Sequence, residues 1–251
     1  MGITGAALAT FLGLLLSFVM GVVYFVTHPN FLHFTFHGLS IKEAFHNMIN
    51  GTSEFVNQLA IAITTVVFNR SALIFAGEDG VAAVSIIMYL QFLCIGIYFG
   101  FSMGLSTPLG YAYGDRNFSV CRVLEKYAYR FFAIAPVILY GCTYLLAPIG
   151  VRFFASPSST VFDMAVSGLR LYGLGFLFSG INIFAAIRMM TYGKGYISGM
   201  ITFLRSFALL LLFLTVLPRF LELNGIWLAV PTAEILTLIV ALWTLRKKTV
   251  S

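Results

Sequence analysis

Residues 51–70 read GTSEFVNQLAIAITTVVFNR, an apolar stretch long enough to cross a bilayer that nevertheless carries several polar side chains. On a helix, the spacing of four, seven and four residues puts four of them on one face: Glu54, Gln58, Thr65 and Asn69. A carboxyl group in hydrocarbon costs about 3 kcal/mol or more, so such a side chain normally faces a cavity or a partner helix. The stretch therefore predicts a membrane span with one polar face.

The composition predicts an integral membrane protein. Of its 251 residues, 60% are hydrophobic and only 10% are charged, whereas about 25% are charged in soluble domains. The net charge of +6 comes from basic residues between apolar stretches, which fits the positive-inside rule better than binding to nucleic acid. The three cysteines show neither disulfide nor metal-ligand spacing, so we expect reduced thiols.

Seven apolar stretches have the length of a transmembrane helix, which predicts an all-α, polytopic fold. They cover residues 3–27, 53–76, 81–105, 127–147, 164–187, 197–217 and 226–245. We divide the chain into a first helix (1–27), a loop with an amphipathic helix (28–50) and a six-helix lobe (51–251). The sequence SIKE at 40–43 is a capping-box pattern that predicts where the amphipathic helix begins. The sequence GEDG at 77–80 predicts a tight turn between two spans.

The distribution of Lys and Arg predicts the orientation in the membrane. With the C-terminus in the cytoplasm, the cytoplasmic segments together with Arg130 hold ten basic residues and the outer segments hold two. The positive-inside rule then places the N-terminus outside, in a multi-pass protein of the inner (cytoplasmic) membrane.

Several motifs resemble one transporter family. They are NGTSEF at 50–55, AITTVVFN at 62–69, GEDGVAA at 77–83, YAYGDRN at 111–117, RS at 205–206 and GIWLAVPTAE at 225–234, with GITGAALAT at 2–10 as a further match. Together they resemble the MATE (multidrug and toxic compound extrusion) transporters, most closely their MepA-like branch. No single motif is specific, but their order along the chain is.

The resemblance implies a fold of twelve helices in two six-helix lobes, with substrate passing through a central cleft. This chain would then be helix six and the whole second lobe, a truncated or split half of a full transporter. A complementary N-terminal lobe is the partner that the resemblance implies. The predicted orientation agrees, because helix six of that fold starts outside.

The resemblance also implies a cation site. In some members an acid on helix seven and another on helix ten contribute to cation binding in the second lobe. Glu54 matches the first position, whereas Asn182 stands at the second. An amide does not exchange a proton in the working pH range. Glu54 is therefore the main candidate for the residue that couples cation binding to transport. The one metal ion that we expect is Na⁺, bound at Glu54.

Each of the other polar residues within the predicted spans could have one of two roles. Gln58, Thr65, Asn69, Gln91 and Asn182 either line the cleft or form bonds between helices. Glu54 and Glu234 lie near the start of their spans, so each could instead stabilise a helix N-terminus. We expect Arg170 and Arg205 to have structural roles, by snorkelling or by pairing with acids and carbonyls.

These observations predict a secondary active exporter of drugs or organic cations, driven by Na⁺ or H⁺ antiport through alternating access. We do not expect the protein to be an enzyme or to need a cofactor other than the coupling ion. We expect membrane lipid to surround it. Two alternatives stay open. One is a flippase for lipid-linked precursors, although only Arg70, Arg170 and Arg205 place basic charge within spans. The other is a non-transporting remnant or helix-pairing module.

Overall fold

A computed structural model describes residues 2–27 and 40–246, with the side chains of residues 2, 3, 6, 42–57 and 246 left out. The chain divides into two compact units, Met1–Gly51 and Thr52–Ser251. In the first unit, helix α1 (Gly2–Thr27) is apolar over its whole length and its described side chains are largely exposed. Most of the predicted loop, residues 28–39, lies outside the described residues.

Helix α2 (Ile41–Gly114) begins directly after Ser40, as the capping pattern predicts. The helix then continues through the stretch 51–76 without a break. Between residues 41 and 76 the sequence contains no Pro and the described backbone has no positive φ.

The long helix α2 is divided at Gly77, where φ is 63° and ψ is −153°. This conformation is open to Gly and strained for other residues. Three residues later, a Cβ on Gly80 would lie 2.7 Å from the Cβ of Ala76 and 2.8 Å from the carbonyl oxygen of Ala72. The predicted turn at 77–80 is confirmed, and both of its glycines have a steric reason.

Replacing Gly77 tests this turn. Gly77→Ala is expected to lower the stability of the chain by about 1–3 kcal/mol, because Ala would be held at a strained φ and ψ. The melting temperature in detergent measures the effect. Gly114→Ala is the control, because Gly114 has open space around its Cβ position and no positive φ. Equal melting temperatures of the two variants would contradict the strain argument.

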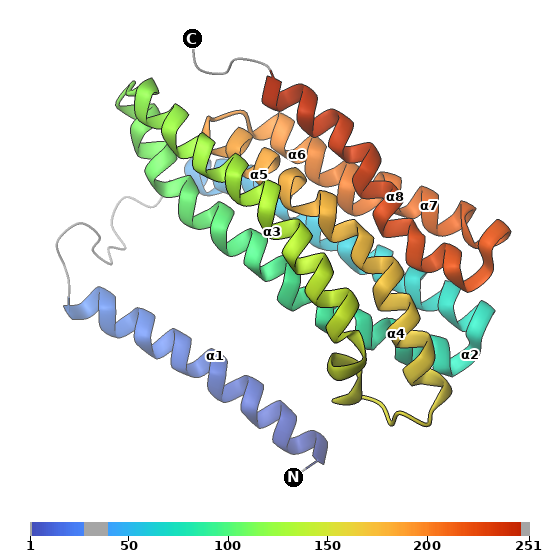
Figure 1. Ribbon diagram of the computed structural model, residues 1–251. Coiled ribbons are helices and arrows are strands. Elements are labelled where there is room, and N and C mark those ends of the chain that lie inside the picture. Colours follow the sequence, from blue (N-terminus) through green and yellow to red (C-terminus); the bar gives the residue numbers. More distant parts are fainter. Residues whose placement is uncertain (1, 28–39, 247–251) are drawn as a thin grey trace. The chain divides into compact units, whose positions relative to one another are not determined.

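The remaining helices follow in order. They are α3 (Phe118–Arg152), α4 (Thr160–Tyr172), the 3₁₀ turn η1 (Gly173–Gly175), α5 (Phe176–Thr191), α6 (Gly195–Phe203), the π-helical turn η2 (Leu204–Ala208), α7 (Leu209–Val216) and α8 (Pro218–Arg246), which bends at Glu222. Figure 1 shows the long helices of the second unit lying side by side in a bundle.

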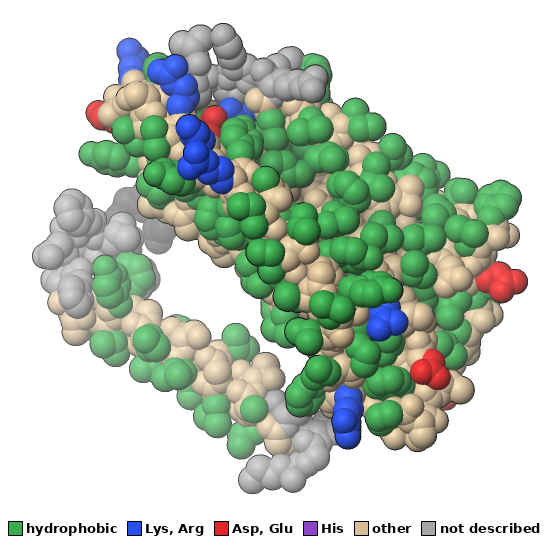
Figure 2. All heavy atoms as spheres, in the orientation of Figure 1, with side chains coloured by type: hydrophobic (Ala, Val, Ile, Leu, Met, Phe, Trp, Pro, Cys, Tyr) green, Lys and Arg blue, Asp and Glu red, His purple; other side chains and the backbone are tan. Residues whose placement is uncertain are grey.

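Six of the described helical stretches are long and apolar enough to cross a membrane. One of them, Gln58–Gly114, is divided at Gly77 and supplies two spans. Each of the seven predicted spans therefore has a counterpart, and the all-α fold is confirmed. On the face shown in Figure 2, hydrophobic side chains cover the middle of the bundle and most charged ones gather toward its ends.

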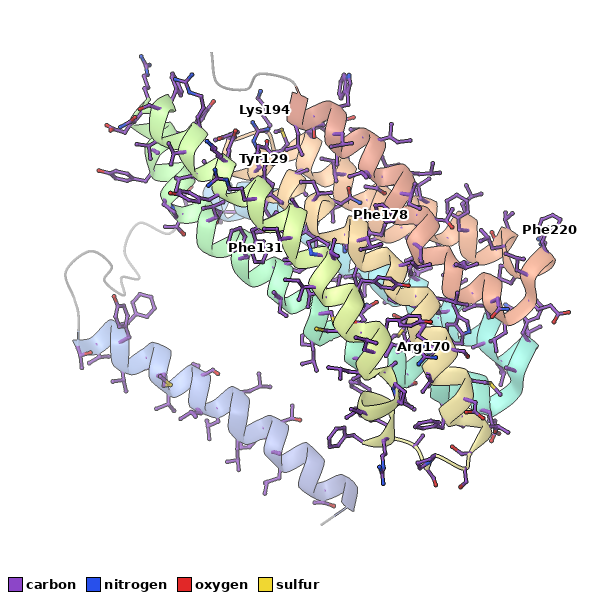
Figure 3. The ribbon with its side chains drawn as sticks, in the orientation of Figure 1. Tyr129, Phe131, Arg170, Phe178, Lys194 and Phe220 are labelled. Atoms are coloured by element: carbon purple, nitrogen blue, oxygen red, sulfur yellow. The ribbon has the colours of Figure 1, made fainter. Side chains whose placement is uncertain are left out.

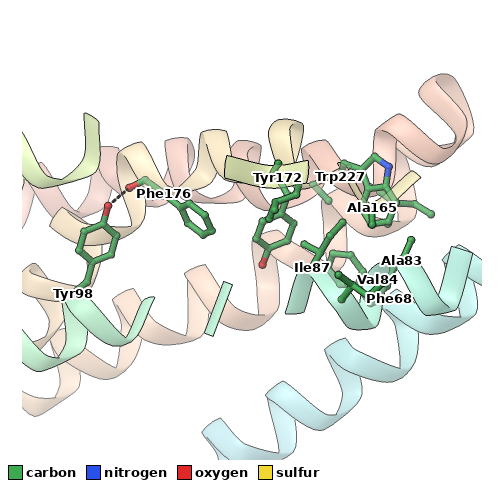
Figure 4. Close-up of a cluster of buried hydrophobic side chains, with 14 of the residues drawn as sticks. Phe68, Ala83, Val84, Ile87, Tyr98, Ala165, Tyr172, Phe176 and Trp227 are labelled. Carbon is green, nitrogen blue, oxygen red and sulfur yellow. Dashed lines mark hydrogen bonds between the residues drawn. The ribbon is translucent and has the colours of Figure 1, made fainter. Parts of the chain in front are cut away.

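The core of the second unit packs α2, α3, α4, α5 and α8 around large buried side chains. Trp227 of α8 and Tyr172 of α4 lie in the same cluster as Phe68 of α2. Tyr98 of α2 donates a hydrogen bond of 2.9 Å to the backbone oxygen of Phe176 (Figure 4). This bond satisfies the hydroxyl group of a fully buried tyrosine and ties α2 to the start of α5.

Candidate functional site

Helices of the second unit lose regular α-helical geometry at two turns that contact α8. The turn η1 separates α4 from α5, the turn η2 separates α6 from α7, and both contact α8. Within α8, Pro231 removes one backbone donor. Gly175 permits the close approach of η1 to α8, since a Cβ at this position would lie 3.2 Å from Cγ1 of Val230 and 3.5 Å from the nitrogen of Pro231. Such irregular turns are frequent at functional sites.

A buried polar network lies among these turns. Glu234 of α8 is 4% exposed. Its Oε1 accepts a hydrogen bond of 2.6 Å from Nε of Arg205 in η2, and its Oε2 accepts one of 2.7 Å from Nδ2 of Asn182 in α5. The same Nδ2 donates a bond of 2.9 Å to the backbone oxygen of Glu234. Three helical segments that are distant in sequence therefore meet at one carboxylate.

The charge of this carboxylate is balanced within the protein. The side chain of Glu234 is 5% exposed and that of Arg205 is 15% exposed. A buried carboxylate without a partner would cost several kcal/mol, and the guanidinium offsets most of that penalty. The pair is thus close to neutral.

The orientation of Asn182 follows from its partners. Both atoms bonded to its Nδ2 are acceptors, so only the NH₂ end of the amide fits there. The Oδ1 end is buried and has no hydrogen-bond partner among the described side chains and backbone groups. A fully buried amide oxygen in this state is uncommon, which marks the position as one that can accept a further donor or a cation.

The polar span of α2 reaches the same region through Thr64, which the sequence did not single out. Its hydroxyl group lies 2.7 Å from the backbone oxygen of Ala60 and 3.2 Å from that of Ser206 in η2. A hydroxyl has one proton to donate, so these two carbonyl groups share it. The irregular turn that carries Arg205 is therefore bonded to α2.

The residues of the predicted polar face that the structure describes differ in exposure and in their hydrogen bonds. The side chain of Glu54 lies outside the described residues, and Gln58 is exposed. Thr65 donates only to the carbonyl of its own helix at Ile61, 2.9 Å away. Asn69 is half-buried, and its Oδ1 lacks a hydrogen-bond partner in the part of the chain that the structure describes.

Of the other predicted residues, Asn182, Glu234 and Arg205 come together in the network, whereas two lie apart from it. Gln91 is half-buried in α2 and forms no hydrogen bond to any described residue. Arg170 donates a bond of 3.3 Å to the backbone oxygen of Tyr144, and its Cζ lies 4.8 Å from the centroid of the Tyr144 ring. Figure 3 places Arg170 and Lys194 toward opposite ends of the bundle.

A second buried ion pair was missed in the sequence. Nε of Arg188 in α5 lies 2.5 Å from Oε1 of Glu125 in α3, and the hydroxyl group of Tyr192 donates a bond of 2.6 Å to the same oxygen. Burial, and then the bond to Glu125, raise the pKa of the Tyr192 phenol above its ordinary value, so this group stays protonated. Glu125 lies 63 positions before Arg188 and 67 before Tyr192, so no local spacing links the acid to its two partners.

Within the described residues, no three His, Cys, Asp or Glu side chains gather as metal ligands would. The three cysteines are unpaired thiols, as predicted. An ion at the network would therefore have to bind the carboxylate of Glu234 together with amide or carbonyl oxygens.

The chain is similar in fold to solved transporters. With an outward-facing multidrug resistance MATE family transporter of the MOP superfamily, the TM-score is 0.82 and the identity 22%, over 97% of this chain and 55% of that one. With a MOP superfamily transporter from Pyrococcus furiosus Vc1 (DSM3638), the TM-score is 0.81 and the identity 22%, over 97% and 56%. With a MATE protein in complex with MaL6, the TM-score is 0.82 and the identity 22%, again over 97% and 56%.

The chain thus spans about half the length of the solved structures that it matches. No curated protein matches the sequence. The family model MatE matches residues 55–217, which is more than half of the chain. The matched range contains Asn182, Arg205 and the polar stretch that begins directly after Glu54. The chain is therefore a multi-pass membrane protein that belongs to the MatE family.

Proposed function

We propose that this chain forms one lobe of a secondary transporter that exports organic cations or drugs in exchange for Na⁺ or H⁺. Family membership supports transport as the activity. The observation that carries the proposal is the buried network of Asn182, Arg205 and Glu234, since ionisable residues within a membrane are costly and mark the path of an ion or substrate.

The depth of the network supports this role. Glu234 lies twelve residues after the bend at Glu222 and twelve before the end of α8 at Arg246. At 1.5 Å per residue it is about 18 Å from the bend and about 18 Å from the end of α8, a depth that corresponds to the middle of a bilayer. Secondary transporters bind substrates and coupling ions at that depth, beside helices with interrupted geometry.

We infer that Glu54 couples cation binding to the opening of the cleft. It belongs to the polar stretch of α2, and Thr64, ten residues further on, bonds to the turn that carries Arg205. A cation at Glu54 would change the charge on α2, and the bond from Thr64 offers a route by which that change reaches Arg205. The orientation remains the proposed one, with the N-terminus outside the inner membrane and the C-terminus in the cytoplasm.

We propose that the first, N-terminal lobe of the transporter comes from a complementary set of helices. Alternating access requires two lobes that rock about a central cleft, and this chain spans about half of the matched structures. Within the family, we expect this chain to be most similar to the MepA-like branch.

Efflux of ethidium tests the proposed function. In a host that lacks its own exporters, the chain co-expressed with a first lobe from a MatE-family transporter is expected to lower ethidium accumulation, because the cleft is then complete. Glu54→Gln should remove most of this efflux, since the amide neither binds a proton nor carries the charge that holds Na⁺.

Glu78→Gln is the matched control, because Glu78 is an exposed acid in the same helix just beyond the Gly77 bend. Its efflux is expected to equal that of the unchanged chain. Absence of efflux in every pairing would favour the non-transporting module, and full efflux by Glu54→Gln would rule out the coupling role of Glu54.

A further inference from the structure

Three basic side chains follow one another along the first turns of α3. Arg122, Lys126 and Arg130 are four residues apart, which places them on one face of the helix over about 12 Å of its axis. All three are exposed. On the face shown in Figure 2, Lys and Arg side chains gather over this part of α3. We call these three residues the basic stripe.

The positive charge of the basic stripe is not balanced by neighbouring acids. Among the described side chains, no carboxylate oxygen lies within 4.0 Å of a nitrogen of the stripe. Glu125 is the only acid in α3, and it is buried and paired with Arg188. Like charges four residues apart on a helix repel one another, so an anion that lies between them is stabilising.

The face that carries the basic stripe becomes apolar beyond Arg130. Ile134 and Val137, four and seven residues further along α3, are 61% and 64% exposed. The predicted span of this helix starts at residue 127, so Arg130 lies just inside it and Arg122 lies outside. One exposed face of α3 is therefore basic at the edge of the membrane and apolar within it.

The direction of α3 brings the basic groups toward the membrane surface. In a helix the Cα–Cβ bonds tilt toward the N-terminus, and the N-terminal end of α3 is the end outside the predicted span. Arg130 and Lys126 therefore lean toward the level of Arg122, as long basic side chains near the end of a membrane helix do when they snorkel. A phosphate at that level can bind more than one of them.

We propose that the basic stripe binds the headgroup of an anionic phospholipid, whose acyl chains lie along Ile134 and Val137 on the same face of α3. A free phosphate ion would gain only the contact with the charges, whereas a lipid also covers the apolar residues beside them. In the proposed orientation the stripe faces the cytoplasmic leaflet, in which anionic lipids produce a negative surface potential. The site does not depend on the proposed transport function.

Native mass spectrometry of the purified full chain in a neutral detergent tests the proposal. The probes are phosphatidylglycerol, which is anionic, and phosphatidylcholine with the same acyl chains, which is zwitterionic. Phosphatidylglycerol is expected to bind at a concentration at least about tenfold lower. The triple variant Arg122→Gln, Lys126→Gln and Arg130→Gln should need about a hundredfold more phosphatidylglycerol for equal occupancy, because each basic residue near an anionic surface contributes about a factor of five.

The matched control removes the same charge elsewhere. It combines Arg152→Gln, Lys194→Gln and Arg219→Gln, three exposed basic residues outside the stripe. We expect this control to bind phosphatidylglycerol as the unchanged chain does. Inorganic phosphate should not raise the melting temperature of the unchanged chain above that in chloride of equal ionic strength, whereas phosphatidylglycerol should.

Several results would overturn the inference. Equal binding of the two lipids would show that the headgroup is not recognised. An equal loss of binding in the two triple variants would assign the effect to net charge rather than to the stripe. A rise in melting temperature with inorganic phosphate as large as that with phosphatidylglycerol would indicate an ion site instead of a lipid site.

A single substitution keeps the proposal testable if the triple variant fails to fold. Arg122→Gln lies outside the predicted span and should weaken phosphatidylglycerol binding about fivefold. Unchanged binding by this variant would then decide against the site. These measurements need no transport, so their failure and the failure of ethidium efflux are separate results.

Discussion

Glu125→Leu is expected to lower the free energy of unfolding of the lobe by about 3–5 kcal/mol, because it leaves the buried charge of Arg188 without a partner. Arg188 is 3% exposed and cannot lose its proton. The hydroxyl group of Tyr192 loses its acceptor at the same time. One atom of the guanidinium, Nη1, already lacks a hydrogen-bond partner among the described residues. The melting temperature in detergent, together with the yield of folded protein, measures the loss.

Combining Glu125→Leu with Arg188→Met is expected to restore most of that stability. Buried ion pairs can often be replaced by apolar residues of similar volume at little cost, whereas removal of one partner is strongly destabilising. Asp115→Asn is the surface control, since Asp115 is exposed, and it should change the melting temperature little. If Glu125→Leu were as stable as Asp115→Asn, the ion pair would not be a structural clamp between α3 and α5.

The two buried ion pairs should respond differently to the loss of one partner. Arg188 without Glu125 remains a buried charge under all conditions. A carboxyl group has a neutral form, whereas a guanidinium does not. We therefore expect Arg205→Gln to be tolerated better than Glu125→Leu.

The second large effect is expected at Gly225, in the bend that leads into the main part of α8. A Cβ there would lie 2.5 Å from both the carbonyl carbon and the oxygen of Leu217, and 2.6 Å from the nitrogen of Pro218. These are backbone atoms, which cannot rotate away as a side chain can. Gly225→Ala should therefore displace the bend and lower stability by about 3 kcal/mol, the upper end of the usual range for overpacking.

Gly199→Ala is the matched control in α6. Its Cβ position meets no described atom within 4 Å, so the substitution should be neutral or stabilise the helix by about 1 kcal/mol. Melting temperatures of both variants in the same detergent give the comparison. A Gly225→Ala protein that melts with the unchanged chain would show that the bend can widen without loss.

Much of the fold could be predicted from local signals. The lengths of the apolar stretches predicted seven spans, and each has a counterpart in the structure. The capping pattern predicted the start of α2, and the glycines at 77 and 80 predicted its division. These predictions hold because helix length and turn geometry depend on nearby residues and on the thickness of the bilayer.

The candidate site was predictable only in part. Asn182, Arg205 and Glu234 were recognised as polar residues within spans, and the cost of burying them implied partners. Which partner each would take was not visible, because they are separated by 23 and 29 residues in the sequence. Glu125 was not singled out in the sequence, because its partner Arg188 lies 63 positions later and only the packing of α3 against α5 brings the two together.

In the polar stretch at 51–70, too, the sequence determined some properties and only the tertiary structure decided others. Its composition determined that it crosses the membrane, since twenty mostly apolar residues satisfy both the thickness of the bilayer and the hydrogen bonds of a helix. Its face pattern did not determine its contacts: Thr65 bonds within its own helix, whereas Thr64 on the neighbouring face reaches Ser206. Only the packing of α2 against the π-helical turn decided that, because a carbonyl group becomes available to another helix where the regular ladder is interrupted.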